Sequence, residues 1–170
     1  MAEAGERVET LELKSVSFTV NGRPWGGDVP VEEVLLDTLR QRIGLVGTKR
    51  SCESEVCGAC TVLVNGEPVS SCSYLAFEAN DAQVTTVEGL ATGDDLSPLQ
   101  DAFVRHVAAQ CGYCTPGQLM AATALLARNE SPTFTDIQHW MSGNICRCGC
   151  YPAIAAAIQE AAAELRARGR

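Results

Sequence analysis

The chain has 170 residues, of which 46% are hydrophobic and 20% charged, and its mean hydropathy is +0.02. This balance is typical of a soluble globular protein and argues against both a disordered chain and a membrane protein, and the length suits one domain or two small ones. Thirteen Lys and Arg against 21 Asp and Glu give a net charge of −8. That charge argues against non-specific nucleic-acid binding, which needs a basic surface.

The first 20 residues carry acidic side chains and no continuous apolar stretch. They resemble neither a secretory signal nor a membrane anchor. We therefore expect a cytoplasmic protein without membrane insertion, whose partners are proteins or small molecules.

The N-terminal half of the chain predicts a small α+β unit. Apolar residues alternate from Leu11 to Val20, the pair Asn21-Gly22 is a strong turn signal, and a second strand follows over residues 25–29. Apolar residues then recur at helical spacing over residues 34–43, and Gly44 stands where a C-terminal cap belongs. One amphipathic helix is expected to cover the hairpin.

A second hairpin and a short last strand complete this unit. Residues 61–64 and 68–71 flank the turn signal Asn65-Gly66, and residues 84–87 are a further candidate strand. The polar, glycine-bearing stretch 89–95 is the natural linker to the second half.

The second half predicts four helices, which we expect to begin near residues 98, 115, 135 and 153. Two of the starts carry capping boxes, Ser97 with Gln100 and Thr135 with Gln138. The last helix extends to about Arg168.

Nine cysteines are unusual in a chain of this size. An odd number without an export signal points to metal or redox chemistry in a reducing compartment. Cys52, Cys57, Cys60 and Cys72 have the C-x4-C-x2-C…C spacing of plant-type [2Fe-2S] sites. Gly58 allows the tight turn that directs three thiolates to one cluster. Four-cysteine zinc is the weaker alternative, because zinc sites favour paired C-x2–4-C motifs.

A second set consists of Cys111, Cys114, Cys146 and Cys148, with the pattern C-x2-C…C-x-C. Each pair precedes a predicted helix start, and the positive N-terminal ends of two helices suit an anionic thiolate cluster. The pattern alone is less specific than the first, and zinc remains an alternative for it.

The two patterns occur in one order that resembles a known family. The runs are GTKRSCESEVCGACTVLVNGEPVSSC, TTVEGLA, QCGYCTPG and GNICRCGCYPAI. They closely resemble the two-cluster iron–sulfur subunit of the xanthine oxidase family of molybdenum hydroxylases, including the small chain of aerobic carbon monoxide dehydrogenase. The resemblance implies an α+β fold, with a β-grasp, plant-type ferredoxin-like domain over residues 1–88 and a four-helix bundle domain over residues 96–170.

The resemblance also implies the roles of the cysteines. Cys52, Cys57, Cys60 and Cys72 would bind the [2Fe-2S] cluster nearer a flavin, and Cys111, Cys114, Cys146 and Cys148 the cluster nearer the molybdopterin. Gln110 and Cys148 would lie close to the pterin.

In such a complex the chain transfers single electrons and binds no substrate, while a large subunit binds molybdopterin and a medium subunit binds FAD. The alternative is a free-standing soluble ferredoxin-type carrier, against which the second cluster pattern counts.

The chain departs from the family pattern at three positions. Ser51 and Glu55 stand where glycine is usual, and a positive φ there would cost a non-glycine residue about 1 kcal/mol. Glu55 would also add negative charge beside the first cluster. Cys150 stands where many relatives have glycine, and we interpret it as a spare, partly buried thiol, with replacement of Cys148 as the alternative. His106 and His139 are interpreted as packing or surface residues.

Overall fold

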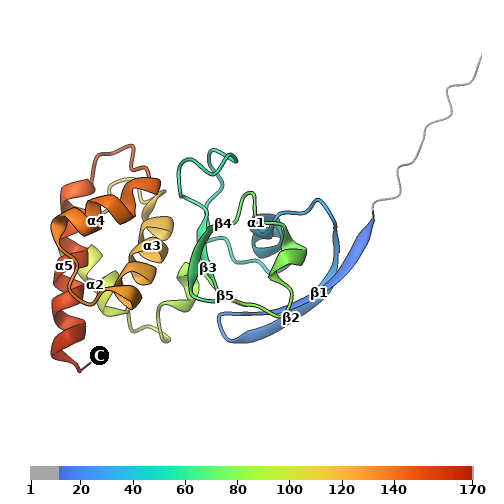
Figure 1. The fold of residues 1–170 in the computed structure, drawn as a ribbon, viewed down its shortest axis with the longest axis horizontal. Helices are drawn as coiled ribbons and strands as arrows, with labels where there is room; N and C mark the ends of the chain where they lie inside the picture. Colours follow the sequence, from blue (N-terminus) through green and yellow to red (C-terminus); the bar gives the residue numbers. More distant parts are fainter. Residues whose placement is uncertain (1–11, 170) are drawn as a thin grey trace, which may run out of the picture.

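The computed structural model describes residues 12–169 as a mixed sheet followed by a group of helices (Figure 1). The sheet has five strands in the order β2-β1-β5-β3-β4. Strand β1 is parallel to β5, and the other neighbouring strands are antiparallel. The strands are β1 Leu13–Val20, β2 Arg23–Pro30, β3 Thr61–Val64, β4 Glu67–Ser70 and β5 Gln83–Thr85. We call residues 13–89 the sheet unit.

Both predicted hairpins are present. The turn residues Asn21-Gly22 have φ of 50° and 75°, and Asn65-Gly66 have φ of 51° and 84°. A type I′ turn needs two residues in this left-handed region, which Asn and Gly tolerate best. The predicted strand start at Leu11 lies outside the described residues. The last strand ends at Thr85, and residues Val87–Gly89 form the 3-10 turn η3 instead of extending it.

The helix predicted over residues 34–43 is present, but most of it is not an α-helix. One turn of α1, Leu35–Asp37, leads into the π-helix η1, Thr38–Arg42. The N–H of Ile43 donates to the carbonyl of Thr38, five residues earlier, at 3.1 Å. The apolar side chains of Leu35 and Leu39 are fully buried in the core of the sheet unit. Apolar spacing indicates a buried helical face but does not distinguish the two windings over so few turns.

The side chain of Glu33 fixes the start of this helical segment. Its carboxylate accepts hydrogen bonds from the guanidinium of Arg42 at 2.7 and 2.6 Å and from the hydroxyl of Thr38 at 2.7 Å. The hydrogen bond from Arg42 lowers the pKa of Glu33 most, with Thr38 contributing in the same direction. A carboxylate with a lowered folded pKa stabilises the fold above its unfolded pKa and loses that contribution as the pH falls through the folded value.

We expect Glu33→Gln to lower the free energy of unfolding at pH 7 by about 1 kcal/mol, because the ion pair is partly exposed. The difference from the wild type should shrink as the pH falls below 4.5, the ordinary pKa of Glu33. Thermal unfolding of both proteins at pH 7 and pH 4 measures this difference in the free energy of unfolding. Glu32→Gln, which changes the exposed neighbouring carboxylate, is the control. An unchanged difference at the lower pH would contradict this role.

Four α-helices form the second part of the chain, which we call the helical unit (residues 98–167). Its core contains Leu99, Phe103, Leu125, Ile154 and Ile158. The predicted capping box at the first helix is confirmed, because the Ser97 hydroxyl accepts from the N–H of Gln100 at 3.3 Å. The helices are α2 Pro98–Arg105, α3 Thr115–Arg128, α4 Phe134–Trp140 and α5 Tyr151–Ala167.

The predicted capping box of the third helix is wrong by two residues. Thr133, not Thr135, is the N-cap of α4, and its hydroxyl accepts from the N–H of Asp136 at 3.2 Å. The Asp136 carboxylate in turn accepts from the N–H of Thr133 at 2.8 Å. Both threonines have a suitable partner three residues later. The charged carboxylate of Asp136 interacts more favourably with the positive helix end than the amide of Gln138.

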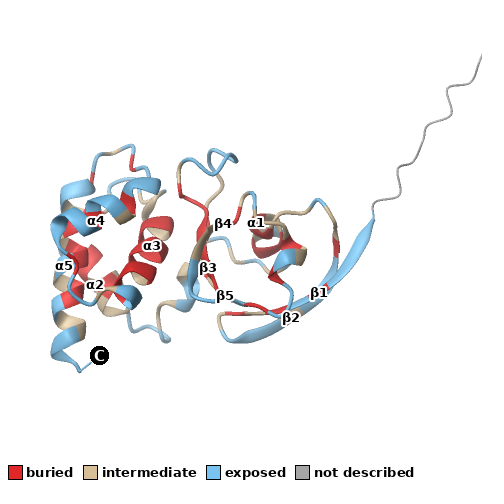
Figure 2. Ribbon diagram, viewed as in Figure 1, coloured by how far each residue is buried: buried red, intermediate tan, exposed pale blue. Residues whose placement is uncertain are grey.

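The sheet unit and the helical unit pack directly on each other. Helix α3 lies against β3, where Leu63, Met120 and Ala124 form a small shared core (Figures 1 and 2). Helix α3 is therefore buried on more than one side (Figure 2). Within residues 12–169, the structure contains no helix with the length and apolar character needed to cross a membrane.

Candidate metal centres

The first candidate site is the loop between η1 and β3 together with the end of β4. Cys52, Cys57 and Cys60 belong to the loop, and Cys72 follows β4. The carbonyl of Cys60 accepts from the hydroxyl of Ser71 at 2.7 Å, which joins the loop to the residue before Cys72. The structure thus brings the loop that carries three of the predicted residues next to the fourth. Their exposure decreases along the loop, from exposed Cys52 to buried Cys60.

Backbone N–H groups in this loop are directed at a cysteine sulfur. The N–H of Cys57 lies 3.4 Å from the Sγ of Cys52. The N–H groups of Ser54 and Cys57 lower the pKa of Cys52 to about 6. Burial and the neighbouring Cys72 thiol raise the pKa of Cys60 to about 12. The outer part of the loop therefore favours thiolate already, while Cys60 needs a bound cation to lose its proton.

The second candidate site lies where two helices begin. Cys111 and Cys114 come just before α3, and Cys146 and Cys148 come just before α5. The N–H of Cys150, the N-cap of α5, lies 3.4 Å from the Sγ of Cys146. Two helices therefore begin directly after the two cysteine pairs, as the sequence predicted.

The pKa shifts of Cys111 and Cys114 depend on cysteines of the other loop. The N–H of Tyr113 and then the Cys148 thiol lower the pKa of Cys111. Burial and then the thiol of Cys146 raise the pKa of Cys114 to about 12. The thiols of Cys148 and Cys146 thus affect the titration of Cys111 and Cys114, which belong to the other loop.

The donor set of both sites fits a [2Fe-2S] cluster. All nine cysteines are free thiols, and eight form the two sets. A [2Fe-2S] cluster needs four thiolates divided between two irons, with N–H groups directed at the sulfurs. Within residues 12–169, no three His, Cys, Asp or Glu side chains surround a position for one metal ion. The donor chemistry of each set, four cysteines, therefore matches that of a [2Fe-2S] site.

Of the two residues that replace the usual glycines, only one has the backbone conformation that favours glycine. Glu55 has φ of 61°, in the left-handed region, as expected for a position usually held by glycine. Ser51 is not among the residues with positive φ, so the expected strain is wrong for that residue. Glu53, which the sequence did not single out, also has positive φ, 56°. Two glutamates therefore hold strained turns in the first loop, at about 1 kcal/mol each.

Cys150 lies closer to the second site than a spare thiol requires. Its side chain is 5% exposed, and burial followed by the adjacent Cys146 thiol raises the pKa of Cys150. The backbone N–H of Gln110 acts on the pKa of Cys150 in the opposite direction. The side chain of Gln110 itself is exposed, as is Cys111 next to it.

The two candidate sites are joined by a direct backbone contact. The N–H of Ile145 donates to the carbonyl of Cys57 at 2.9 Å. Ile145 is covalently bonded to Cys146, a member of the second set. One hydrogen bond therefore connects Cys57 of the first set to the residue before Cys146 of the second, although the two loops are far apart in the sequence. The sequence carries no local signal for this contact.

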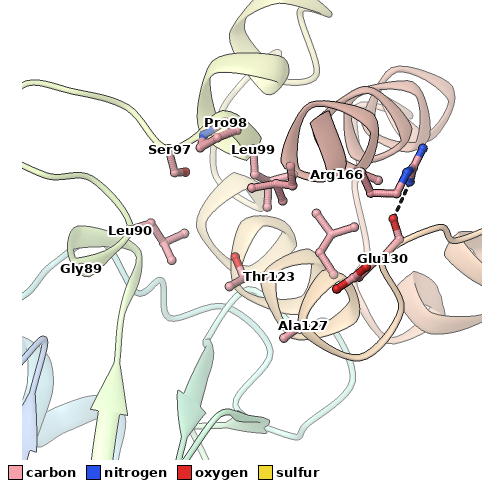
Figure 3. A pocket seen from close by; sticks show the side chains of 12 residues that line it. Gly89, Leu90, Ser97, Pro98, Leu99, Thr123, Ala127, Glu130 and Arg166 are labelled. Atoms are coloured by element: carbon pink, nitrogen blue, oxygen red, sulfur yellow. Dashed lines mark hydrogen bonds between the residues drawn. The ribbon is translucent and has the colours of Figure 1, made fainter. Parts of the chain in front are cut away.

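A cavity lies away from both cysteine sets. It has a volume of about 420 Å³ and lies between the linker and helices α2, α3 and α5 (Figure 3). Its lining includes Leu90, Leu99, Thr123 and Leu165 but none of the nine cysteines. The candidate chemistry is therefore in the loops and not in this cavity.

Two family models match the two parts of the chain that contain the cysteine sets. The family model "2Fe-2S iron-sulfur cluster binding domain" matches residues 18–91, and "[2Fe-2S] binding domain" matches residues 86–159. The aldehyde oxidoreductase iron-sulfur-binding subunit PaoA of Escherichia coli (strain K12) is 42% identical, over 91% of this chain and 74% of that protein. The xanthine dehydrogenase iron-sulfur-binding subunit of Escherichia coli O157:H7 is 43% identical, over 84% of this chain and 91% of that protein.

A solved structure has the same fold. The crystal structure of quinoline 2-oxidoreductase from Pseudomonas putida 86 contains a chain that matches with a TM-score of 0.88 and 46% identity, covering 92% of this chain and 98% of that one. The similarity extends over both the sheet unit and the helical unit. The chain therefore belongs to the two-cluster iron–sulfur subunits of the xanthine oxidase family of molybdenum hydroxylases.

Proposed function

We propose that this chain is the electron-transfer subunit of a molybdenum hydroxylase complex, which passes single electrons from a molybdopterin centre through two [2Fe-2S] clusters to FAD. Family membership supports the two clusters and the place in an oxidoreductase complex. The observation that carries the series arrangement is the hydrogen bond between Ile145 and Cys57. A free-standing ferredoxin-type carrier is not favoured, because the similarity to complex subunits covers both units.

The proposed ligands are the two sets of four cysteines. Cys52, Cys57, Cys60 and Cys72 would hold one cluster, and Cys111, Cys114, Cys146 and Cys148 the other. When bound, each cluster would supply a one-electron couple. The chain's own contribution is electrostatic: the N–H groups of Cys57 and Cys150 point at ligand sulfurs and stabilise their negative charge.

The route between the sites runs through the backbone. It leads from the Cys57 side chain to its carbonyl, across the 2.9 Å hydrogen bond to the N–H of Ile145, and along the chain to Cys146. Electronic coupling is stronger through bonds than across a gap, so this contact is the natural crossing point. Ile145 needs to hold only its backbone position and does not change its protonation.

Each site has one end open to a partner. Gln110 and Cys111 are exposed at the second site, and Cys52 is exposed at the first. We propose that Gln110 and Cys148 face the pterin of a large subunit, and that the loop with Cys52 faces the FAD-binding medium subunit. An electron can then enter at one end of the chain and leave at the other.

The finer organisation follows the same proposal. The β-grasp, ferredoxin-like domain would comprise residues 1–88 and the four-helix bundle domain residues 96–170, with both outer ends outside the described residues. The two separate apolar cores support this division. A cytoplasmic location is proposed because thiols that bind clusters must stay reduced.

The test is metal and spectroscopic analysis of the complex that contains this chain. We expect about four irons and about four acid-labile sulfides per chain, since each cysteine set completes one [2Fe-2S] cluster. The reduced protein should give two distinguishable EPR signals, because a hairpin loop and two helix ends surround the clusters differently. About two irons in fully loaded protein, or zinc in place of iron, would contradict the proposal.

A further inference from the structure

Asn144 lies at the centre of the contact between the two units. It is 7% exposed, and its side-chain Nδ2 donates to the carbonyl of Gly58 at 3.0 Å and approaches the hydroxyl of Thr61 at 3.4 Å. Its own carbonyl accepts from the side-chain amide of Gln118, on α3, at 3.0 Å. One asparagine thus joins the first cysteine loop, the second cysteine loop and α3.

The hydrogen bond of Asn144 stands next to the one that links the two sites. Asn144 binds the carbonyl of Gly58, and the following residue, Ile145, binds the carbonyl of Cys57. Two consecutive residues of one loop therefore hold two consecutive carbonyls of the other. A single hydrogen bond leaves a loop free to rotate about it, whereas two adjacent bonds fix both distance and orientation.

The residues around these two hydrogen bonds are closely packed. Gly58 has φ of 68°, and a Cβ added there would lie 2.4 Å from Nδ2 of Asn144. A Cβ added at Gly117, in the first turn of α3, would lie 2.1 Å from the carbonyl oxygen of Gly58. The first loop is therefore seated between α3 and Asn144, and glycine at both positions permits the approach.

We propose that Asn144 is a positioning residue that fixes the Cys57 carbonyl to Ile145 N–H bridge and thereby sets the rate of electron transfer between the two clusters. This inference rests on the proposed function. In this step one electron would pass from the reduced cluster of the helical unit to the oxidised cluster of the sheet unit, so that the first would become oxidised and the second reduced. No covalent bond forms or breaks, and no proton is transferred.

Asn144→Asp is the direct test, made in the assembled complex. The substitution keeps the size of the side chain but removes both N–H donors and directs a carboxylate oxygen at the Gly58 carbonyl. We expect iron content and the separate EPR signals to stay as in the wild type. The magnetic interaction between the two reduced clusters should weaken, and electron transfer from the helical-unit cluster to the sheet-unit cluster should slow by about 10-fold or more.

Asn129→Ala is the matched control. Asn129 also belongs to the helical unit, and its side chain accepts from the N–H of Ser131 at 2.9 Å, within its own loop. It should change neither the magnetic interaction nor the transfer rate. A wild-type interaction and transfer rate in Asn144→Asp with both clusters present would overturn the proposal.

Gln118→Met keeps the proposal testable if Asn144→Asp does not load its clusters. Gln118 is 1% exposed, and its Oε1 has no hydrogen-bond partner within residues 12–169, so methionine suits the site. This variant removes the support of the Asn144 carbonyl and should slow inter-cluster transfer in the same direction. A wild-type rate would overturn the proposal. A wild-type complex without two clusters would instead refute the proposed function.

Discussion

Replacing Cys57 by serine is expected to stop electron delivery to the flavin in the assembled complex. Cys57 is proposed to bind the sheet-unit cluster, and its carbonyl accepts the hydrogen bond from Ile145. The variant therefore impairs the cluster that would pass electrons to the flavin. Flavin reduction by substrate should slow by more than about 100-fold, because loss of a ligand exceeds the usual effect of an outer-shell change. Reduction of the helical-unit cluster should proceed as before.

Rapid mixing with substrate, followed by EPR and flavin absorbance, separates these events. Val56→Ala is a suitable control, because it shortens an exposed, uncharged side chain of the same loop that is not a cysteine. Co-purification of all three subunits verifies assembly of the variant. If flavin in Cys57→Ser were reduced at the wild-type rate, electrons would bypass the sheet-unit cluster and the series arrangement would have to be abandoned.

The parts of the fold that sequence predicted are those with local signals. The turns at Asn21-Gly22 and Asn65-Gly66 need backbone angles that these residues favour, and the capping box at Ser97 satisfies N–H groups only three residues away. Where two local signals competed, as at Thr133 and Thr135, the spacing alone did not decide. The π-helical winding of residues 38–42 was likewise hidden, because it leaves the apolar face unchanged.

In the candidate sites too, the sequence predicted the features that are local and missed those that depend on the folded chain. The spacing of the cysteines predicts two sets, since three members of the first and two adjacent pairs of the second are close in sequence. Asn144 and Gly58 are 86 positions apart, and no periodicity relates them. Their contact depends on how α3 packs against β3, which is a property of the folded chain. The proximity of Cys150 to Cys146 required the turn before α5 to be known.

Cys148→Ser is expected to abolish or severely disturb the helical-unit cluster, whereas Cys150→Ser should retain both clusters. Cys111, Cys114, Cys146 and Cys148 already supply four thiols, and the Cys148 thiol lowers the pKa of Cys111, as expected of neighbours in one set. Iron should fall from about four to about two per chain in Cys148→Ser and stay at about four in Cys150→Ser. EPR of the reduced complexes shows which signal is lost.

The two substitutions are each other's control, because both exchange sulfur for oxygen in one loop, two residues apart. Cys150 has its N–H 3.4 Å from the Cys146 sulfur, and serine retains that backbone donor. The burial of Cys150 allows a modest change in the EPR line shape of its neighbour, since outer groups tune a cluster without holding it. Loss of the helical-unit signal in Cys150→Ser, with its retention in Cys148→Ser, would reverse the assignment and make Cys150 the ligand.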